Sequence, residues 1–181
     1  MKDFILKLTR EAIETYVKTG KKISAPERYP KELDEKKGVF VTIYKKPKEL
    51  RGCIGFPYPQ IPIIRGLIEA AIEACKDPRF SPLSKEELKD IWIEISILSK
   101  PKLIEVRSQK DCLEKIEPGK DGLILQKGYC SGLLLPQVWE EIPVKEDFLE
   151  ALCMKAGLLA DEWLDSSTKI YKFKVQAFKE C

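Results

Sequence analysis

A cysteine between two glycines, preceded by an arginine, is the strongest candidate for chemistry in this chain. Cys53 lies in the stretch LRGCIGF, with Arg51 and Gly52 before it and Gly55 after it. In an extended strand, residues two apart face the same way at a spacing of about 7 Å, so Arg51 and Cys53 would share a face. A guanidinium near a thiol favours the nucleophilic thiolate. A reactive cysteine is therefore one interpretation of this stretch.

The same residues also allow a purely structural interpretation. Free cysteine is among the residue types most often buried. Glycine in a strand commonly marks the close approach of a ligand, a bulge or another backbone. A small thiol between Gly52 and Gly55 could simply let a helix settle on the sheet. Taken alone, the residues favour this interpretation over the reactive one.

The absence of histidine restricts the chemistry further. The chain has none, which excludes serine–histidine and cysteine–histidine relays and histidine-ligated zinc. Proton transfer would have to use carboxylate, lysine, thiol, tyrosine or water. The cysteines form no C-x-x-C pair, so we expect reduced thiols, no metal site and no bound cofactor. They are Cys53, Cys75, Cys112, Cys130, Cys153 and Cys181.

Charge and hydropathy narrow the class of partner. The 181 residues include 32 basic and 29 acidic side chains, a net charge of +3. Nearly balanced charge makes nucleic acid an unexpected partner. Charged residues interrupt the apolar positions of residues 1–20, so this segment resembles neither a signal peptide nor a membrane span. We therefore expect a cytoplasmic protein that does not enter membranes.

Hydrophobic periodicity predicts the same succession of elements twice. The first half contains an amphipathic helix followed by strand, strand, helix and strand, and the second half repeats the last four. Tight hairpins imply antiparallel neighbours, so the fold class is α+β, a mostly antiparallel sheet with flanking helices. We expect a single domain over 1–181 with two lobes, about 1–100 and 101–181. The expected elements are 3–19, 38–44, 50–55, 62–76, 91–98, 122–127, 131–136, 137–156 and 169–178.

Several blocks of sequence resemble the AMMECR-one family. They include LRGCIGF, DPRFSPLSKEEL (77–88), GLLLPQVWEE (132–141) and FLEALCMKAGL (148–158), and the resemblance covers nearly the whole chain. It implies a two-lobed α+β fold with a duplicated strand–helix arrangement and no established activity. Some prokaryotic members are fused to, or encoded beside, a Memo-like protein and a radical-SAM protein, which implies pathway partners of those kinds.

The resemblance also implies a set of residues that face a common cleft. Alternatives exist for several of them: Asp77 and Arg79 could cap a helix end, Trp139 and Cys153 have core spacing, and Gln137 could be a first-turn residue. The implied set is Arg51, Gly52, Cys53, Gly55, Asp77, Arg79, Phe80, Gln137 and Trp139, with Cys153 and Lys155 as further members.

Two functions are compatible with these residues. The first is an enzyme or enzyme subunit acting on a small anionic substrate, with Arg51 and Arg79 holding the anion and Cys53 acting as nucleophile or thiol ligand. The second is a non-catalytic adaptor that binds a protein or a small molecule. The narrow set of catalytic side chains favours the second, and the arginine beside the cysteine favours the first.

Overall fold

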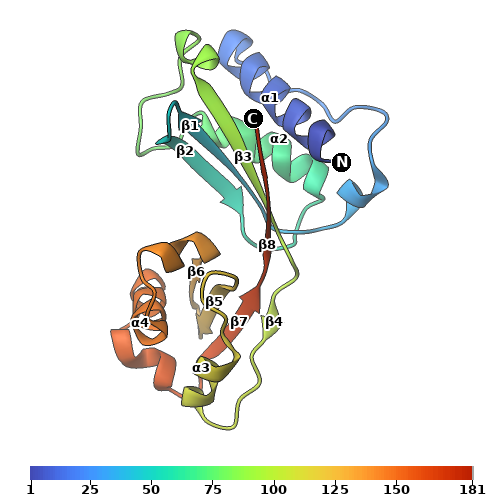
Figure 1. Cartoon of the computed structure of the whole chain (residues 1–181). Helices are drawn as coiled ribbons and strands as arrows, with labels where there is room; N and C mark the ends of the chain where they lie inside the picture. The colour runs from blue at the N-terminus through green and yellow to red at the C-terminus, as the bar shows by residue number, and fades with distance from the viewer. Residues whose placement is uncertain (181) are drawn as a thin grey trace. The chain divides into compact units, whose positions relative to one another are not determined.

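Two four-stranded sheets with helices on them make up residues 1–180, which this computed structural model describes (Figure 1). One unit consists of residues 1–98 together with the segment that begins at Gln176, and the other runs from Ser99 to Val175. The predicted lobe boundary near residue 100 lies close to this division. The C-terminal segment differs, because it belongs to the first unit.

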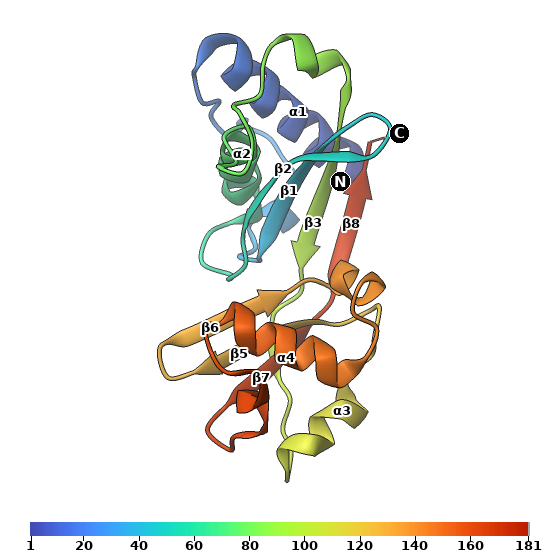
Figure 2. The ribbon, with the colours of Figure 1, turned by 90° about the vertical axis from the view of Figure 1, so that its left-hand side faces the viewer.

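The first unit has the strand order β2-β1-β3-β8. Its helices α1 and α2 lie on one face of the sheet (Figure 2). The predicted first helix is confirmed: α1 ends where Gly20 adopts a φ of 72° and donates its backbone N–H to the Tyr16 carbonyl, a left-handed cap that glycine adopts without strain. The elements are α1 (Lys2–Thr19), η1 (Lys31–Asp34), β1 (Val39–Lys45), β2 (Glu49–Phe56), α2 (Ile63–Ala74), η2 (Glu86–Lys89), β3 (Ile91–Leu98) and β8 (Val175–Lys179).

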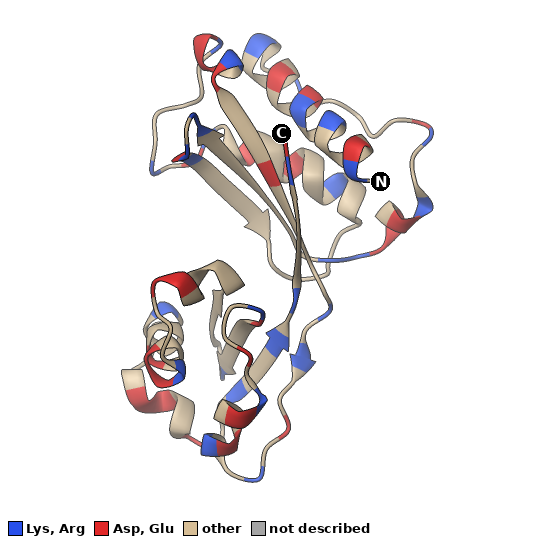
Figure 3. Cartoon of the chain, in the orientation of Figure 1, with Lys and Arg blue, Asp and Glu red and all other residues tan. Residues whose placement is uncertain are grey.

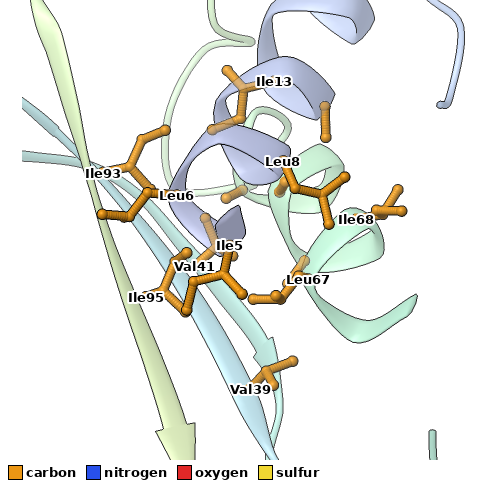
Figure 4. Packing of buried hydrophobic residues seen from close by; sticks show 14 of the residues in the cluster. Ile5, Leu6, Leu8, Ile13, Val39, Val41, Leu67, Ile68, Ile93 and Ile95 are labelled. Atoms are coloured by element: carbon orange, nitrogen blue, oxygen red, sulfur yellow. The ribbon is translucent and has the colours of Figure 1, made fainter. Parts of the chain in front are cut away.

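Alternation along β1 and β3 separates the two faces of this sheet. Val41 and Ile95 pair across the strands and point at α1 and α2, where they meet Ile5 and Leu67 (Figure 4). Burial of these branched side chains against the helices stabilises the unit at roughly 25 cal/mol per Å² of apolar surface. The alternate residues of these strands, such as Thr42, therefore point to the opposite face of the sheet.

The second unit has the strand order β4-β7-β5-β6. Its core includes Trp139, whose ring stacks on Phe148 with centroids 3.7 Å apart and whose indole N–H donates to the Asp121 carbonyl. The elements are β4 (Lys102–Leu103), η3 (Gln109–Asp111), α3 (Cys112–Lys115), β5 (Gly122–Lys127), β6 (Cys130–Leu134), η4 (Pro136–Glu140), α4 (Lys145–Lys155), η5 (Ala160–Leu164) and β7 (Lys169–Phe173).

The two units repeat one arrangement, which confirms the predicted α+β class and its duplication. The succession β1, β2, α2, β3 recurs as β5, β6, α4, β7, and the strands are ordered β2-β1-β3 and β6-β5-β7. The strand expected over 169–178 is divided in two. Its break is at Lys174, whose backbone N–H donates to the Ser99 hydroxyl, so β7 completes one sheet and β8 the other.

Candidate functional site

A β-bulge in the β1–β2 hairpin determines where Arg51 points. Gly52 pairs with Ile43 and Leu50 with Tyr44, so Arg51 has no residue opposite it, and a bulge of this kind redirects a side chain. Arg51 donates from Nε to Glu87 Oε1 at 2.8 Å and from Nη2 to Glu87 Oε2 at 3.0 Å. Its side chain is only 11% exposed. The guanidinium beside the thiol in sequence is therefore already paired.

Glu87 lies three residues after Ser84, the spacing of a helix-capping pair,. Its Oε2 also accepts the backbone N–H of Ser84 at 2.9 Å. The hydrogen bonds from Arg51 lower the pKa of Glu87 to about 2, because they outweigh the opposing effect of burial,. The pair joins the edge strand β2 to η2, which gives Arg51 a structural partner in the protein itself.

The space beside Gly52 and Gly55, where a side chain would lie, is occupied by other parts of the protein. A Cβ on Gly52 would lie 2.2 Å from the carbonyl oxygen of Ala74, so the last turn of α2 packs directly on the strand backbone. A Cβ on Gly55 would lie 2.4 Å from Cγ of the Phe40 ring, which covers it from the neighbouring strand. Both glycines thus permit a close approach.

Asp77 connects this edge strand to an exposed arginine. Its carboxylate, 1% exposed, accepts the Cys53 backbone N–H at 2.9 Å through Oδ2. Arg79 donates to the same carboxylate from Nε at 3.0 Å and from Nη2 at 2.7 Å. The hydrogen bonds from Arg79 hold the pKa of Asp77 well below its usual range,. Asp77 therefore carries a charge throughout the neutral range.

The Arg79 guanidinium is held by protein contacts on one side and is exposed to solvent on the other. Its guanidinium carbon lies 5.5 Å from the centroid of the Phe80 ring, within the range of a cation–π contact. Yet 57% of its side chain is exposed. The structure thus brings Cys53, Asp77, Arg79 and Phe80 together, as the sequence implied.

Cys53 belongs to a row of polar side chains on the sheet face away from the helices. Register places Cys53 opposite Thr42, and Thr42 opposite Glu94; we call these three the polar row. The Cys53 Sγ lies 3.1 Å from the Thr42 Oγ1. Glu94 is buried, and its Oε2 lies 3.0 Å from the Nζ of Lys179 on β8.

Burial dominates the electrostatics of the thiol. It raises the pKa of Cys53, and the hydrogen bond with Thr42 and the positive charge of Arg79 only partly offset it,. The thiol is therefore protonated near neutral pH. An unpaired Arg51 beside it would have favoured thiolate, but that arginine is held by Glu87. The charge that acts on the sulfur instead belongs to Arg79.

Sequence reasoning did not identify Thr42, Glu94 and Lys179 as part of this site. One signal was available for Glu94, because the alternation in 91–98 places it opposite the isoleucine face,. Its pairing with Thr42 depends on the register between two strands, which alternation does not fix. Lys179 could not be assigned, because the strand expected there belonged to the second half of the chain.

The remaining predicted residues lie in the second unit. Gln137 is exposed in η4, and Lys155 is exposed at the end of α4. Trp139 and Cys153 are buried in the core, as the alternative interpretation predicted. A role for Gln137 in binding the same ligand as Cys53 stays a prediction.

Residues 1–180 contain no group of three or more Cys, Asp or Glu side chains placed to hold a metal ion. Within the same range, the helices are too short or too polar to traverse a bilayer.

Comparison with known proteins identifies the family. The AMMECR1 family model matches residues 6–178. A protein of Pyrococcus abyssi is 49% identical over 188 residues, covering 98% of this chain and 89% of the relative. A protein of Methanocaldococcus jannaschii is 50% identical over 184 residues, with the same coverage. The crystal structure of an uncharacterised protein from Pyrococcus horikoshii is 48% identical, with a TM-score of 0.91 over 99% of this chain and 91% of that chain. The chain therefore belongs to the AMMECR1 family.

Proposed function

We propose that the first unit binds a small anionic molecule, such as a carboxylate or phosphate, through Arg79. The exposed guanidinium that Asp77 and Phe80 hold in place is the observation that carries this proposal. A planar guanidinium offers several donors in a fixed fork and pairs well with carboxylate and phosphate oxygens. Because the side chain is already ordered, a ligand does not have to pay for its rotamer entropy.

The geometry of Arg79 leaves donors for such a ligand. Nε and Nη2 are used by Asp77, and Nη1 has no hydrogen-bond partner among residues 1–180. The Asp77–Arg79 pair is neutral overall, so the attraction is local and depends on the ligand reaching the exposed edge. The neighbouring Cys53 would contribute a neutral S–H rather than a second charge.

Binding without turnover is favoured over nucleophilic catalysis by the state of the thiol. A catalytic cysteine needs a lowered pKa or an adjacent base, and burial moves the pKa of Cys53 the other way. This is the adaptor function of the two that the sequence allows, with a small anion as its ligand.

Thiol catalysis is the second candidate, because one observation favours it. The Thr42 hydroxyl touches the Cys53 sulfur, and the next residue in the row is the carboxylate of Glu94. In a chain without histidine, Glu94 is the group placed to accept the thiol proton through the Thr42 hydroxyl. In that function the thiol proton moves towards Glu94 as the sulfur adds to a carbonyl carbon of an anionic substrate, and the π electrons of that carbonyl bond move onto its oxygen.

Calorimetric titration with defined anions tests the proposal. The probes are inorganic phosphate, pyrophosphate, malate and citrate, each up to 10 mM. We expect at least one to bind, and Arg79→Ala to weaken that binding about tenfold or more. Arg28→Ala is the matched control, because Arg28 is an exposed arginine of the same unit and should leave binding unchanged.

Two results would contradict the binding function. One is wild-type protein that binds none of the four anions. The other is equal affinity in the Arg79→Ala and Arg28→Ala variants. Cys53→Ala separates the two candidates: it keeps anion affinity if the thiol only lines the site, whereas loss of a turnover measured on the bound anion would support catalysis.

A further inference from the structure

A second charged site lies in the first unit and shares one residue, Lys179, with the surroundings of the polar row. It is a groove of about 540 Å³ between α1, the β1–β2 turn, the start of β3 and the end of β8. Figure 3 shows blue at the start of α1 and at the end of β8. We call it the basic groove, after its six basic lining residues: Lys2, Lys7, Arg10, Lys46, Lys89 and Lys179.

The basic groove holds more positive charge than the chain as a whole. Its six basic residues face two acidic ones, Asp3 and Glu180, which leaves +4 in the groove, whereas the entire sequence has +3. The remaining surface is therefore close to neutral or slightly acidic. The groove thus carries the protein's net excess of positive charge, and such a patch attracts anionic partners over about a Debye length,.

Most of this charge is not neutralised within the protein. Arg10 is paired with Glu180, and Lys179 with Glu94. The other four, Lys2, Lys7, Lys46 and Lys89, form no ion pair with any residue from 1 to 180. Another cavity of the unit, of about 580 Å³, has one lysine in its lining, Lys22, and that lysine forms an ion pair with Glu69 of the same cavity. Lysines without an ion pair thus distinguish the basic groove from this cavity.

The base of the groove is rigid and partly apolar. The Arg10 guanidinium donates to the carbonyls of Leu88 and Ile91 as well as to Glu180. Glu180 in turn accepts the Ile93 backbone N–H at 2.9 Å. Leu6, Leu88, Ile91 and Trp92 supply apolar lining. A ligand thus meets apolar surface bordered by flexible cations.

We propose that the basic groove binds an acidic peptide segment of a partner protein, one that alternates carboxylate and aliphatic side chains. Lysines at the border match the carboxylates, and the apolar lining matches the aliphatic groups. A groove of this volume accommodates a few side chains. Single-stranded nucleic acid fits less well, because it needs several aromatic faces on which to stack its bases, whereas Trp92 is the one aromatic side chain among the lining residues and one face of its ring is taken by Tyr44. The proposal does not depend on anion binding at Arg79.

Fluorescence anisotropy with a labelled peptide tests this inference. The probe is a twelve-residue peptide that alternates Glu and Leu, compared with the same peptide carrying Lys for Glu and with a twelve-nucleotide single strand. We expect the acidic peptide to bind most tightly at low salt and to lose affinity as salt rises. Lys7→Glu/Lys89→Glu should weaken it about tenfold or more, because two attractive charges become repulsive.

The matched control changes net charge equally outside the groove. Lys31→Glu/Lys100→Glu reverses two exposed lysines that do not line it, and affinity should change less than about twofold. Equal weakening by both double variants would mean that overall charge, not the groove, attracts the peptide, and would overturn the proposal. Tighter binding of the oligonucleotide, or no binding of the acidic peptide by wild-type protein, would overturn it as well.

Discussion

The β1–β2 and β5–β6 hairpins each have a glycine at the corresponding position, but the residues around that glycine differ. Gly52 on β2 pairs with Ile43, which pairs with Ile93. Gly132 on β6 pairs with Leu125, which pairs with Ile170. Both glycines lie under the last turn of a helix, close to backbone atoms of α2 and α4 respectively. The duplicated fold therefore needs a glycine here, since each helix packs directly on a strand.

One residue further along, the two units differ in chemistry. The first has the polar row, Cys53, Thr42 and Glu94. The second has Leu133, Ile124 and Tyr171 at the corresponding positions. The same backbone arrangement thus accepts apolar side chains in this row, so its polar character in the first unit is not a requirement of the fold.

The segments that follow α2 and α4 also differ in polarity, and again the polar one is in the first unit. After α2, Asp77 and Arg79 provide a buried carboxylate and an exposed guanidinium. After α4, residues 157–159 are Gly-Leu-Leu, with no charged side chain. The buried carboxylate and the exposed guanidinium of the first unit therefore have no charged counterpart in this segment of the second unit.

The largest expected effect tests the part that the two units share. Gly52→Ala would place a Cβ 2.2 Å from the backbone of α2, whereas Gly132→Ala would place one 2.9 Å from the backbone of α4. We expect Gly52→Ala to lower the free energy of unfolding by about 3 kcal/mol or more and Gly132→Ala by about 1 to 2 kcal/mol. Urea denaturation followed by circular dichroism measures both. A milder effect at Gly52 would show that α2 can shift where α4 cannot.

The next effect concerns the ion pair that the second unit lacks at this position. Glu87→Gln leaves the nearly buried Arg51 guanidinium without its charge partner and should cost about 2 kcal/mol at pH 7. The folded pKa of Glu87, about 2, lies below the unfolded value of about 4.3. Its contribution is therefore complete above about pH 5 and is lost as pH falls towards 2.

The difference between wild type and Glu87→Gln should accordingly shrink when urea denaturation is repeated at pH 4, 3 and 2. The matched control is Glu73→Gln, because Glu73 forms an ion pair with Lys76 in which both side chains are more than 40% exposed. That change should cost less than about 0.5 kcal/mol at every pH. A pH-independent cost for Glu87→Gln would contradict the linkage.

A reciprocal exchange in the row tests the contrast itself. Ile124→Thr puts a hydroxyl at a fully buried apolar position and should cost about 1 to 2 kcal/mol. Thr42→Val removes a hydroxyl whose partner is the weakly hydrogen-bonding thiol of Cys53, and should cost less than about 1 kcal/mol. If Thr42→Val proves the more destabilising of the two in urea denaturation, then the polar row is there for stability.

Sequence alone predicted the elements well, because their signals are local. The alternation of isoleucines fixed 91–98 as a strand, and Gly20 marked the end of the first helix. The destination of the C-terminal strand was not predictable in this way. Residues 169–173 and 175–179 have the same alternating pattern, and only their partners in two different sheets separate them.

For the candidate site, the sequence indicated residues that lie close together but not the contacts that they make. Cys53, Asp77 and Arg79 do meet, but Arg51 turns to Glu87 because of a bulge that no local pattern announces. Thr42 and Glu94 enter the site through strand register, which depends on the whole sheet. Burial, which decides the direction of the Cys53 pKa, is likewise a property of the folded unit.

The smallest expected effect concerns the reactivity of the thiol. Arg79 lowers the pKa of Cys53 through its positive charge, while Asp77 and Glu94 raise it. Arg79→Ala should therefore move the pH profile of Cys53 alkylation by iodoacetamide to higher pH, with less reaction at any pH below its plateau. Mass spectrometry of the Cys53 and Cys130 peptides from one digest gives the rate against an internal reference. Arg28→Ala should leave the profile where it is. A profile that moves to lower pH would contradict this expectation, because it would mean that the Arg79 side chain raises the pKa of the thiol by keeping water from it more than its charge lowers that pKa.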